Sequence, residues 1–153
     1  MHFDDNAAFG RRCFLRHQDD NAYDAAMNKT APDFPNATTS CLLLPGPSGA
    51  LEMAIDLPEA SIARNGVAII CHPNPPDGGT LHNKVVTMCA RALNELGIAT
   101  VRFNFRGVGQ SEGSFDNGRG EVLDLIAVAE WARQARPDAA LWLAGFSFGS
   151  WVA

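Results

Sequence analysis

Residues 139–149 read AALWLAGFSFG, an apolar run that leads without a break into the pattern Gly145-x-Ser147-x-Gly149. The apolar run is typical of a buried strand, and the pattern that follows it predicts a sharp turn into a helix. Such a turn lifts a serine oxygen clear of the backbone, and glycines two residues to either side leave room for the tight bend. The stretch therefore predicts a strand, a nucleophile elbow and a helix start, with Ser147 as the candidate nucleophile.

The sequence before this stretch alternates apolar runs with segments of helical periodicity. The expected strands are residues 41–44, 51–57, 66–71, 98–105 and 139–144. Apolar residues recur at helical spacing over 82–96 and 120–135, which predicts two helices. Because helices separate the last three strands, this order favours the α/β class, with a mostly parallel sheet and crossover helices.

Residues 1–40 differ in composition from the rest of the chain. Leu15 is the one branched aliphatic residue there, among six Asp and four Lys or Arg residues. So few apolar side chains cannot bury enough surface to offset the entropy that is lost when the backbone is ordered. We expect a disordered tail over residues 1–40 and a partial domain over residues 41–153.

The composition of the whole chain excludes several classes of partner. The 153 residues carry a net charge of −5, which argues against a nucleic acid or an anionic membrane as partner. No apolar run is long enough to cross a bilayer, and the first residues lack the apolar segment of a secretory signal. The cysteines show no C-x-x-C spacing, so neither a metal site nor a redox motif is indicated. We expect a cytoplasmic protein with free thiols, no cofactor and no metal; its oligomeric state stays open.

A second pattern, at residues 71–80, reads CHPNPPDGGT and directly follows an expected strand. Acyl transfer to a serine requires two backbone N–H groups that point at the developing oxyanion. Phe148, which follows the candidate nucleophile, would supply one of them. Proline has no N–H, so Asn74 is the residue between Pro73 and Pro76 whose backbone can supply the other. The alternative interpretation is that the prolines only stiffen a connection between two elements.

A third pattern, RFNFRGVGQSEG at residues 102–113, is a glycine-rich loop at the end of a strand. Loops of this kind also bind dinucleotides, through the spacing G-x-G-x-x-G. Here Glu112 occupies the place of the third glycine and Gly113 comes one residue late, and no G-x-x-x-x-G-K-[ST] pattern occurs. Nucleotide binding is therefore a disfavoured alternative, which saturable binding of a dinucleotide would support.

Together, four stretches of the chain resemble the α/β-hydrolase superfamily, and more closely its compact bacterial predicted-hydrolase branch. They are residues 72–80, 83–86, 102–111 and 145–149. The resemblance covers about residues 41–153 and implies an α/β-hydrolase fold whose elbow follows the fifth strand. It also implies that Ser147 is the catalytic nucleophile and that Phe148 and Asn74 are backbone oxyanion donors. The implied reaction is nucleophilic acyl transfer on an ester, thioester or peptide bond of a small-molecule or peptide substrate.

The order of catalytic residues in that superfamily is serine, then an acid, then a histidine. Six residues follow Ser147 here, and none of them is an acid or a histidine. We therefore expect the chain to be a C-terminally truncated fragment that lacks the triad acid and histidine and is inactive by itself. The alternative, from a different functional class, is a non-catalytic α/β-hydrolase remnant or a binding module.

Residues before Ser147 offer no replacement for these two groups. His2 and His17 fall in the expected tail, and His82 is expected to be a solvated polar residue. His72 ends a strand beside the candidate oxyanion loop, and in the family this position shapes the loop rather than accepting the serine proton. Four acids fall in loops or at a helix start, where carboxylates meet the helix dipole favourably, and none stands at a triad position. They are Asp77, Asp116, Glu121 and Asp124.

Overall fold

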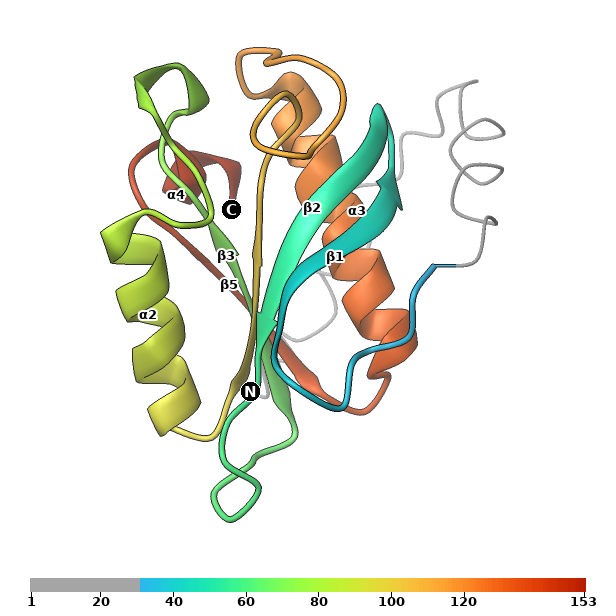
Figure 1. The fold of residues 1–153 in the computed structure, drawn as a ribbon, viewed down its shortest axis with the longest axis vertical. Helices are drawn as coiled ribbons and strands as arrows, with labels where there is room; N and C mark the ends of the chain where they lie inside the picture. The colour runs from blue at the N-terminus through green and yellow to red at the C-terminus, as the bar shows by residue number, and fades with distance from the viewer. Residues whose placement is uncertain (1–30) are drawn as a thin grey trace, which may run out of the picture.

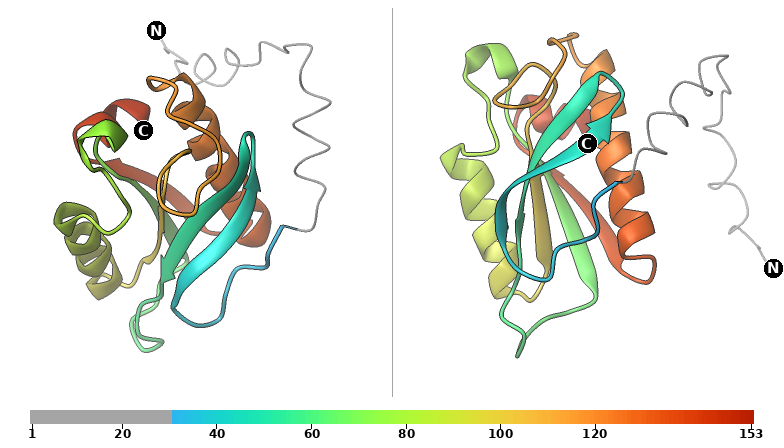
Figure 2. Two further views of the ribbon diagram at one scale, coloured as in Figure 1. Left: turned by 45° about the horizontal axis from the view of Figure 1, so that its top comes forward. Right: turned by 45° about the vertical axis from the view of Figure 1, so that its right-hand side comes forward.

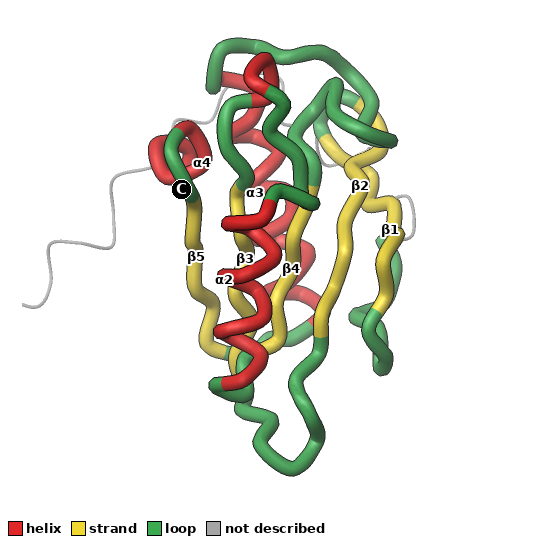
Figure 3. Tube along the Cα trace, turned by 60° about the vertical axis from the view of Figure 1, so that its left-hand side comes forward, coloured by secondary structure: helices red, strands yellow, loops and turns green. Residues whose placement is uncertain are grey.

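The computed structural model describes residues 31–153 as a central β-sheet with helices on both faces (Figure 1). The sheet has five strands in the order β1-β2-β4-β3-β5. They are β1 (Thr39–Gly46), β2 (Gly49–Asp56), β3 (Gly66–Cys71), β4 (Ala99–Phe103) and β5 (Ala140–Gly145). The helices are α2 (Lys84–Glu95), α3 (Arg119–Ala135) and the short α4 (Phe148–Val152), and a 3-10 turn, η1, spans Pro75–Asp77. Figure 3 shows α2 in front of the sheet and α3 behind it, so the elements form three layers.

The sheet is mixed, and its parallel half contains the crossover helices. β3 pairs in parallel with both β4 and β5, and Cys71 lies opposite Gly145 at the end of the second pair. β1 and β2 form an antiparallel hairpin, and β2 runs antiparallel to β4. The structure confirms the expected α/β class with crossover helices, and the N-terminal hairpin adds the antiparallel part.

The central strand β3 is buried along its whole length, because a helical layer packs on each of its faces. On the α3 side the core is built around Trp131 and Phe103, which are almost completely buried. On the α2 side Ile70 packs with Val86 and Ala90. A strand between two helical layers gains apolar burial on both faces, which explains why its sequence is a continuous apolar run.

Two elements are shorter than the sequence pattern predicts. β4 ends at Phe103 rather than at residue 105, because the N–H of Phe105 donates to the imidazole of His72 instead of to a neighbouring strand. α2 begins at Lys84 rather than at residue 82, because the residues before it form a hydrogen-bonded turn. Both differences lie next to the loops that follow β3 and β4, where backbone groups bond to partners outside the regular elements.

The folded unit begins before the boundary expected at residue 41. Phe34 stacks on Trp131 with ring centroids 5.4 Å apart, and the indole N–H of Trp131 donates to the carbonyl oxygen of Pro32 at 2.6 Å. β1 itself starts at Thr39. The segment before β1 therefore packs beside α3 (Figure 2), because its aromatic and apolar side chains find partners on that helix. The rest of the expected tail, residues 1–30, lies outside the described residues.

β5 forms one edge of the described sheet, where β3 is its single strand neighbour. Two large apolar side chains of β5 are half-exposed, Trp142 at 47% and Leu143 at 45%. An edge strand with apolar side chains and unpaired backbone groups is a template for pairing with another chain.

Candidate functional site

The turn after β5 holds Ser147 in a backbone conformation that side-chain-bearing residues rarely adopt. Its φ is 54° and its ψ is −119°, and Asn117 is the other described non-glycine residue with a positive φ. Such a conformation costs on the order of 1–3 kcal/mol and persists where the surrounding structure enforces it. Ser147 is solvent-exposed, and α4 begins at the next residue. The sharp strand-to-helix turn expected from the sequence is thus present, with the serine at its apex.

The surrounding structure that enforces this turn includes its two glycines. A Cβ on Gly145 would overlap the carbonyl oxygen of Gly149, one turn further along the chain. A Cβ on Gly149 would overlap the carbonyl oxygen of Cys71 and lie 2.6 Å from that of His72. Both positions therefore require glycine, because the turn folds back against its own helix and against the end of β3.

The end of β3 brings the second sequence pattern, residues 71–80, to the same edge of the sheet as the elbow. Within this loop the carbonyl oxygen of Asn74 accepts from the N–H groups of Asp77 and Gly79, at 3.1 and 3.0 Å. The Asn74 side chain donates to the Asp77 carboxylate at 2.8 Å. Among the described residues, the backbone N–H groups of Asn74 and Phe148 donate to no protein acceptor. The N–H of Phe148, which adjoins the apex serine, and that of Asn74, in the loop after the neighbouring strand β3, are thus free.

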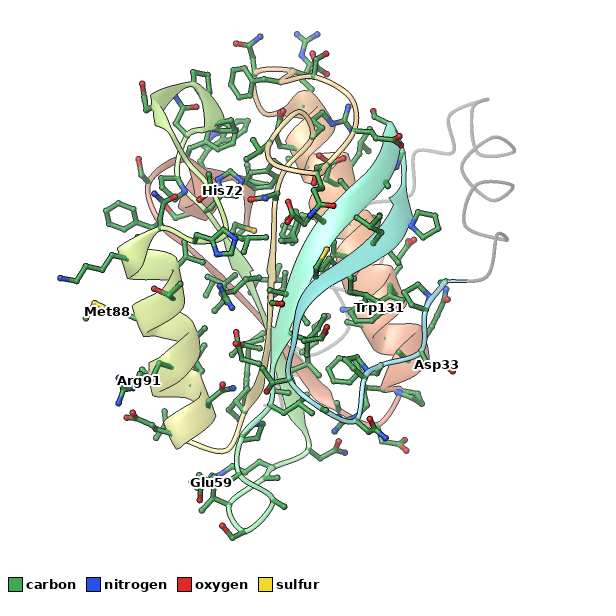
Figure 4. The ribbon with its side chains drawn as sticks, viewed as in Figure 1. Asp33, Glu59, His72, Met88, Arg91 and Trp131 are labelled. Atoms are coloured by element: carbon green, nitrogen blue, oxygen red, sulfur yellow. The ribbon has the colours of Figure 1, made fainter. Side chains whose placement is uncertain are left out.

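His72 lies at the start of this loop and is completely buried (Figure 4). Its Nε2 accepts the backbone N–H of Phe105 at 3.1 Å, and its Nδ1 lies 2.6 Å from the carbonyl oxygen of Pro73. Burial lowers the pKa of His72 from 6.5 to about 4, although the hydrogen bond to Pro73 raises it. The ring is neutral at pH 7 and both of its nitrogens are engaged, so His72 has no free nitrogen with which to accept a proton from Ser147.

Cys71, the residue before His72, is not a candidate nucleophile. Its side chain is fully buried, and burial raises the pKa of its thiol from 9.0 to about 12. The nucleophile is the deprotonated thiolate, and a thiol with so high a pKa stays protonated at pH 7. Cys71 is therefore a core residue that happens to lie beside the elbow.

The side chain of Phe148 belongs to an aromatic cluster beneath the elbow rather than to an open pocket wall. Its ring centroid lies 5.8 Å from those of Phe105 and Phe115 and 6.0 Å from that of Trp151. The ring centroid of Phe105 in turn lies 4.7 Å from that of His72. The cluster fixes the first turn of α4, and with it the free N–H of Phe148, against the loops after β3 and β4.

The loop after β4 is held to α3 by a buried ion pair that the sequence analysis did not anticipate. Arg106 Nη2 lies 2.7 Å from Asp124 Oδ1, and Asp124 is fully buried. The hydrogen bond to Asp124 raises the pKa of Arg106 above its usual value. Glu121, also fully buried, accepts the N–H groups of Asp116 and Gly118. Glu121 and Asp124, two of the acids expected in loops or at a helix start, are therefore structural partners of this loop.

A second network, made of hydrogen bonds, holds the same loop to β2. Glu52 Oε2 accepts from Asn104 Nδ2 and from the N–H of Gln110, both at 2.7 Å. Ser111 Oγ donates to the carbonyl oxygen of Asn104 and accepts the N–H of Glu52. A Cβ on Gly109 would overlap the Glu52 carboxylate. The N–H groups of Gly107, Val108, Gln110 and Ser111 thus donate within the protein, and these four groups are not available to cradle a phosphate.

Two hollows in the described surface lie away from Ser147. One, of about 410 Å³, is lined by residues of α2 and of the connection from β2 to β3, among them Glu59, Asp56 and Arg102. Arg102 and Asp56 are paired with each other at 2.7 Å. Figure 4 shows Glu59 at the opposite end of the molecule from His72. The other, of about 440 Å³, lies beside the turn between β1 and β2. Neither hollow includes the elbow.

Residues 31–153 contain neither a cluster of metal-binding side chains nor a membrane-spanning helix. No three His, Cys, Asp or Glu side chains gather there in a way that could hold a metal ion. No helix in this part of the chain has the length and apolar character needed to span a membrane.

Comparison with known proteins gives related structures. No protein-family model matches the chain. XC6422 of Xanthomonas campestris, described as an α/β serine hydrolase without a lid, is 59% identical with a TM-score of 0.77; the match covers 79% of this chain and 56% of that one. An α/β serine hydrolase homologue of Coxiella burnetii is 50% identical with a TM-score of 0.72, over 80% and 57%. The uncharacterized protein RP471 of Rickettsia prowazekii is 41% identical over 109 residues, which are 71% of this chain and 45% of that one. The chain spans about half the length of these relatives.

Proposed function

Because the chain is related to the α/β-hydrolase superfamily, we propose that it carries the nucleophile and the oxyanion hole of a serine hydrolase. The reaction is acyl transfer from an ester, thioester or peptide bond of a small-molecule or peptide substrate. The observation that supports this most is the conformation of Ser147, exposed at a strained turn and followed by the N–H of Phe148, which has no protein acceptor. We propose a cytoplasmic location on the composition argument given above.

In the first step, Ser147 Oγ attacks the acyl carbonyl carbon and its proton passes to a general base. The carbonyl oxygen becomes an oxyanion, which accepts hydrogen bonds from the N–H groups of Phe148 and Asn74. Collapse of this intermediate breaks the bond to the leaving alcohol, thiol or amine, which takes the proton from the base. Water then attacks the acyl-serine in the same way and releases the carboxylic acid. Removing one oxyanion donor from such a site typically costs about 10²–10³ in kcat.

We propose that the general base and its acidic partner are supplied from outside these 153 residues. His72 uses both ring nitrogens for backbone contacts, and His82 is exposed at the turn before α2. Asp124 and Glu121 are buried and engaged with the loop after β4. Since losing the histidine of a serine triad costs on the order of 10⁶ in kcat, the 153-residue chain by itself should show negligible turnover.

The test is hydrolysis of a p-nitrophenyl ester by the protein expressed from its complete gene. We expect turnover that Ser147→Ala abolishes, and background-level turnover from the 153-residue chain. Ser150→Ala is the matched control: it removes a neighbouring exposed hydroxyl, which donates to the carbonyl oxygen of Ser147 at 2.6 Å, but it leaves Ser147 Oγ in place, so this variant should keep most of its activity. A folded protein that hydrolyses no ester, or one that loses nothing with Ser147→Ala, would favour a non-catalytic binding module instead.

A further inference from the structure

The hollow between α2 and the connection from β2 to β3 has the size of a small-molecule site. Its volume is about 410 Å³, and such sites span roughly 300–1,000 Å³. Apolar lining comes from Leu57 and Ile62 of the connection and from Ala90 of α2. Glu59, which also lines the hollow, lies at the opposite end of the molecule from His72 (Figure 4). The hollow is therefore separate from the candidate functional site, and an inference about it does not depend on the proposed function.

Carboxylates outnumber guanidinium groups in the lining of this hollow. Arg102 Nε lies 2.7 Å from Asp56 Oδ2 at the sheet, so these two charges offset each other. Arg91 Nε lies 3.1 Å from Glu95 Oε1 on α2, which offsets a second pair. The carboxylate of Glu59 has no hydrogen bond or ion pair with residues 31–153. The lining thus keeps one negative charge that is available to a cation.

Asn94 adds a hydrogen-bond acceptor to the same lining. Its Nδ2 donates to the carbonyl oxygens of Asp56 and Ile98, at 3.0 and 2.7 Å, so the orientation of the amide is fixed. Its Oδ1 accepts no hydrogen bond from the described part of the chain and is not buried. Asn94 also lies in the last turn of α2, which contains no basic residue to offset the negative end of the helix dipole. The amide oxygen and the dipole therefore favour a hydrogen-bond donor with positive charge.

We propose that this hollow binds a small organic cation, an ammonium group carried on a short apolar body. The charge of Glu59 attracts the ammonium group, Asn94 Oδ1 accepts a hydrogen bond from it, and the apolar body packs on the apolar lining. An anion of the same size is disfavoured, because all three nitrogens of Arg102 already donate within the protein. Arg91 is likewise paired with Glu95, so an anion would have to compete with a carboxylate for it.

The test is a titration of the ¹⁵N-labelled protein, expressed from its complete gene, with benzylammonium, followed by amide chemical shifts. Benzyl alcohol and benzoate are the matched controls, because they keep the ring and remove or reverse the charge. We expect benzylammonium to give saturable shifts at the Asn94 side-chain amide and the Ile62 backbone amide, with a Kd of about 1–10 mM. Benzyl alcohol should bind at least about threefold more weakly, and benzoate should not saturate. Absence of saturation with benzylammonium, shifts confined to other residues, or equal affinities for the three molecules would overturn the proposal.

A pair of charge-reversal variants tests the role of Glu59 in this binding. Glu59→Lys should weaken the affinity for benzylammonium about threefold to tenfold, because it replaces an attraction by a repulsion. Asp33→Lys is the matched control: it changes the net charge of the protein equally, and Figure 4 shows Asp33 on the opposite side of the molecule from Arg91. Both side chains are exposed and lack partners in residues 31–153, so both variants should melt at nearly the temperature of the unmodified protein. Unchanged affinity in Glu59→Lys, or an equal loss in Asp33→Lys, would contradict the proposal.

Discussion

Arg106 and Asp124 form a buried ion pair in which Nη2 lies 2.7 Å from Oδ1, and the same carboxylate accepts the backbone N–H of Arg106 at 3.0 Å. The pair joins the loop after β4 to α3. That loop also carries Phe115, whose ring contacts Phe148 at 5.8 Å. A Cβ on Gly120 of α3 would overlap the Arg106 guanidinium, so a glycine at this position leaves room for the ion pair. The support beneath the elbow thus depends on two charges that are distant from Ser147 in the sequence.

We predict that Asp124→Ala lowers the free energy of unfolding by about 3–5 kcal/mol, because it leaves the Arg106 charge buried and unpaired. Urea denaturation at pH 7 measures this change. Glu95→Ala is the matched control, since it breaks the exposed pair between Arg91 and Glu95, and exposed pairs contribute about 0.2–1 kcal/mol. Equal effects of the two substitutions would show that the buried pair is not structurally important.

We predict that Gly149→Ala disrupts the elbow, because its Cβ would overlap the carbonyl oxygen of Cys71 at the end of β3. Overpacking of this kind costs about 1–3 kcal/mol or more, and here the displaced element carries Ser147. The variant should melt at a lower temperature and react more slowly with a fluorophosphonate. Gly66→Ala is the control, because its Cβ would meet side chains of Trp142 and Ile98 at 3.1 and 3.2 Å rather than backbone. Unchanged labelling in Gly149→Ala would contradict the steric account of the turn.

Most of the fold could be predicted from local sequence patterns. β3 is recognisable because a strand covered on both faces is a continuous apolar run, and the elbow because its backbone path excludes a Cβ at Gly145 and Gly149. The contacts of the segment just before residue 41 could not be predicted from composition. Pro32 gains a partner from Trp131, 99 residues later in the chain, and no local pattern records such a contact.

The supporting residues of the candidate site were harder to predict, for the same physical reason. In the sequence, Asp124 resembles any acid in the first turns of a helix. No local pattern marks its ion pair with Arg106, because the fold brings the two residues together. Glu52 could have been recognised as a structural residue, because a carboxylate between the apolar residues Leu51 and Met53 must find hydrogen-bond partners when it is buried. The roles of Ser147, Phe148 and Asn74 remain predictions that the experiments above address.

We predict that stability falls between pH 6.5 and pH 4 through His72. Its pKa is about 4 in the folded protein and 6.5 without the fold, so the unfolded chain takes up the proton first as the pH falls. The contribution of His72 to the free energy of unfolding is therefore complete above pH 6.5 and is lost as the pH falls toward 4. The loss is on the order of 3 kcal/mol. Urea denaturation across this range measures the slope. His72→Phe should flatten it, and an unchanged slope in that variant would show that other groups cause the acid loss.

We predict that the edge strand β5 makes the 153-residue chain self-associate. Trp142→Lys should raise the monomer fraction in sedimentation velocity, because a charge on an edge strand opposes pairing with another chain. Met88→Lys is the control, since Met88 is 59% exposed and lies on α2 rather than on the edge strand (Figure 4). A chain that is already monomeric, or one for which both variants act alike, would contradict the prediction.

The most direct test of the central claim is to locate the adduct of a fluorophosphonate by tandem mass spectrometry in the protein expressed from its complete gene. The account predicts one phosphonylated residue, Ser147, and loss of the adduct in Ser147→Ala with retention in Ser150→Ala. An adduct on a different residue, or no adduct in a protein that is shown to be folded, would contradict it.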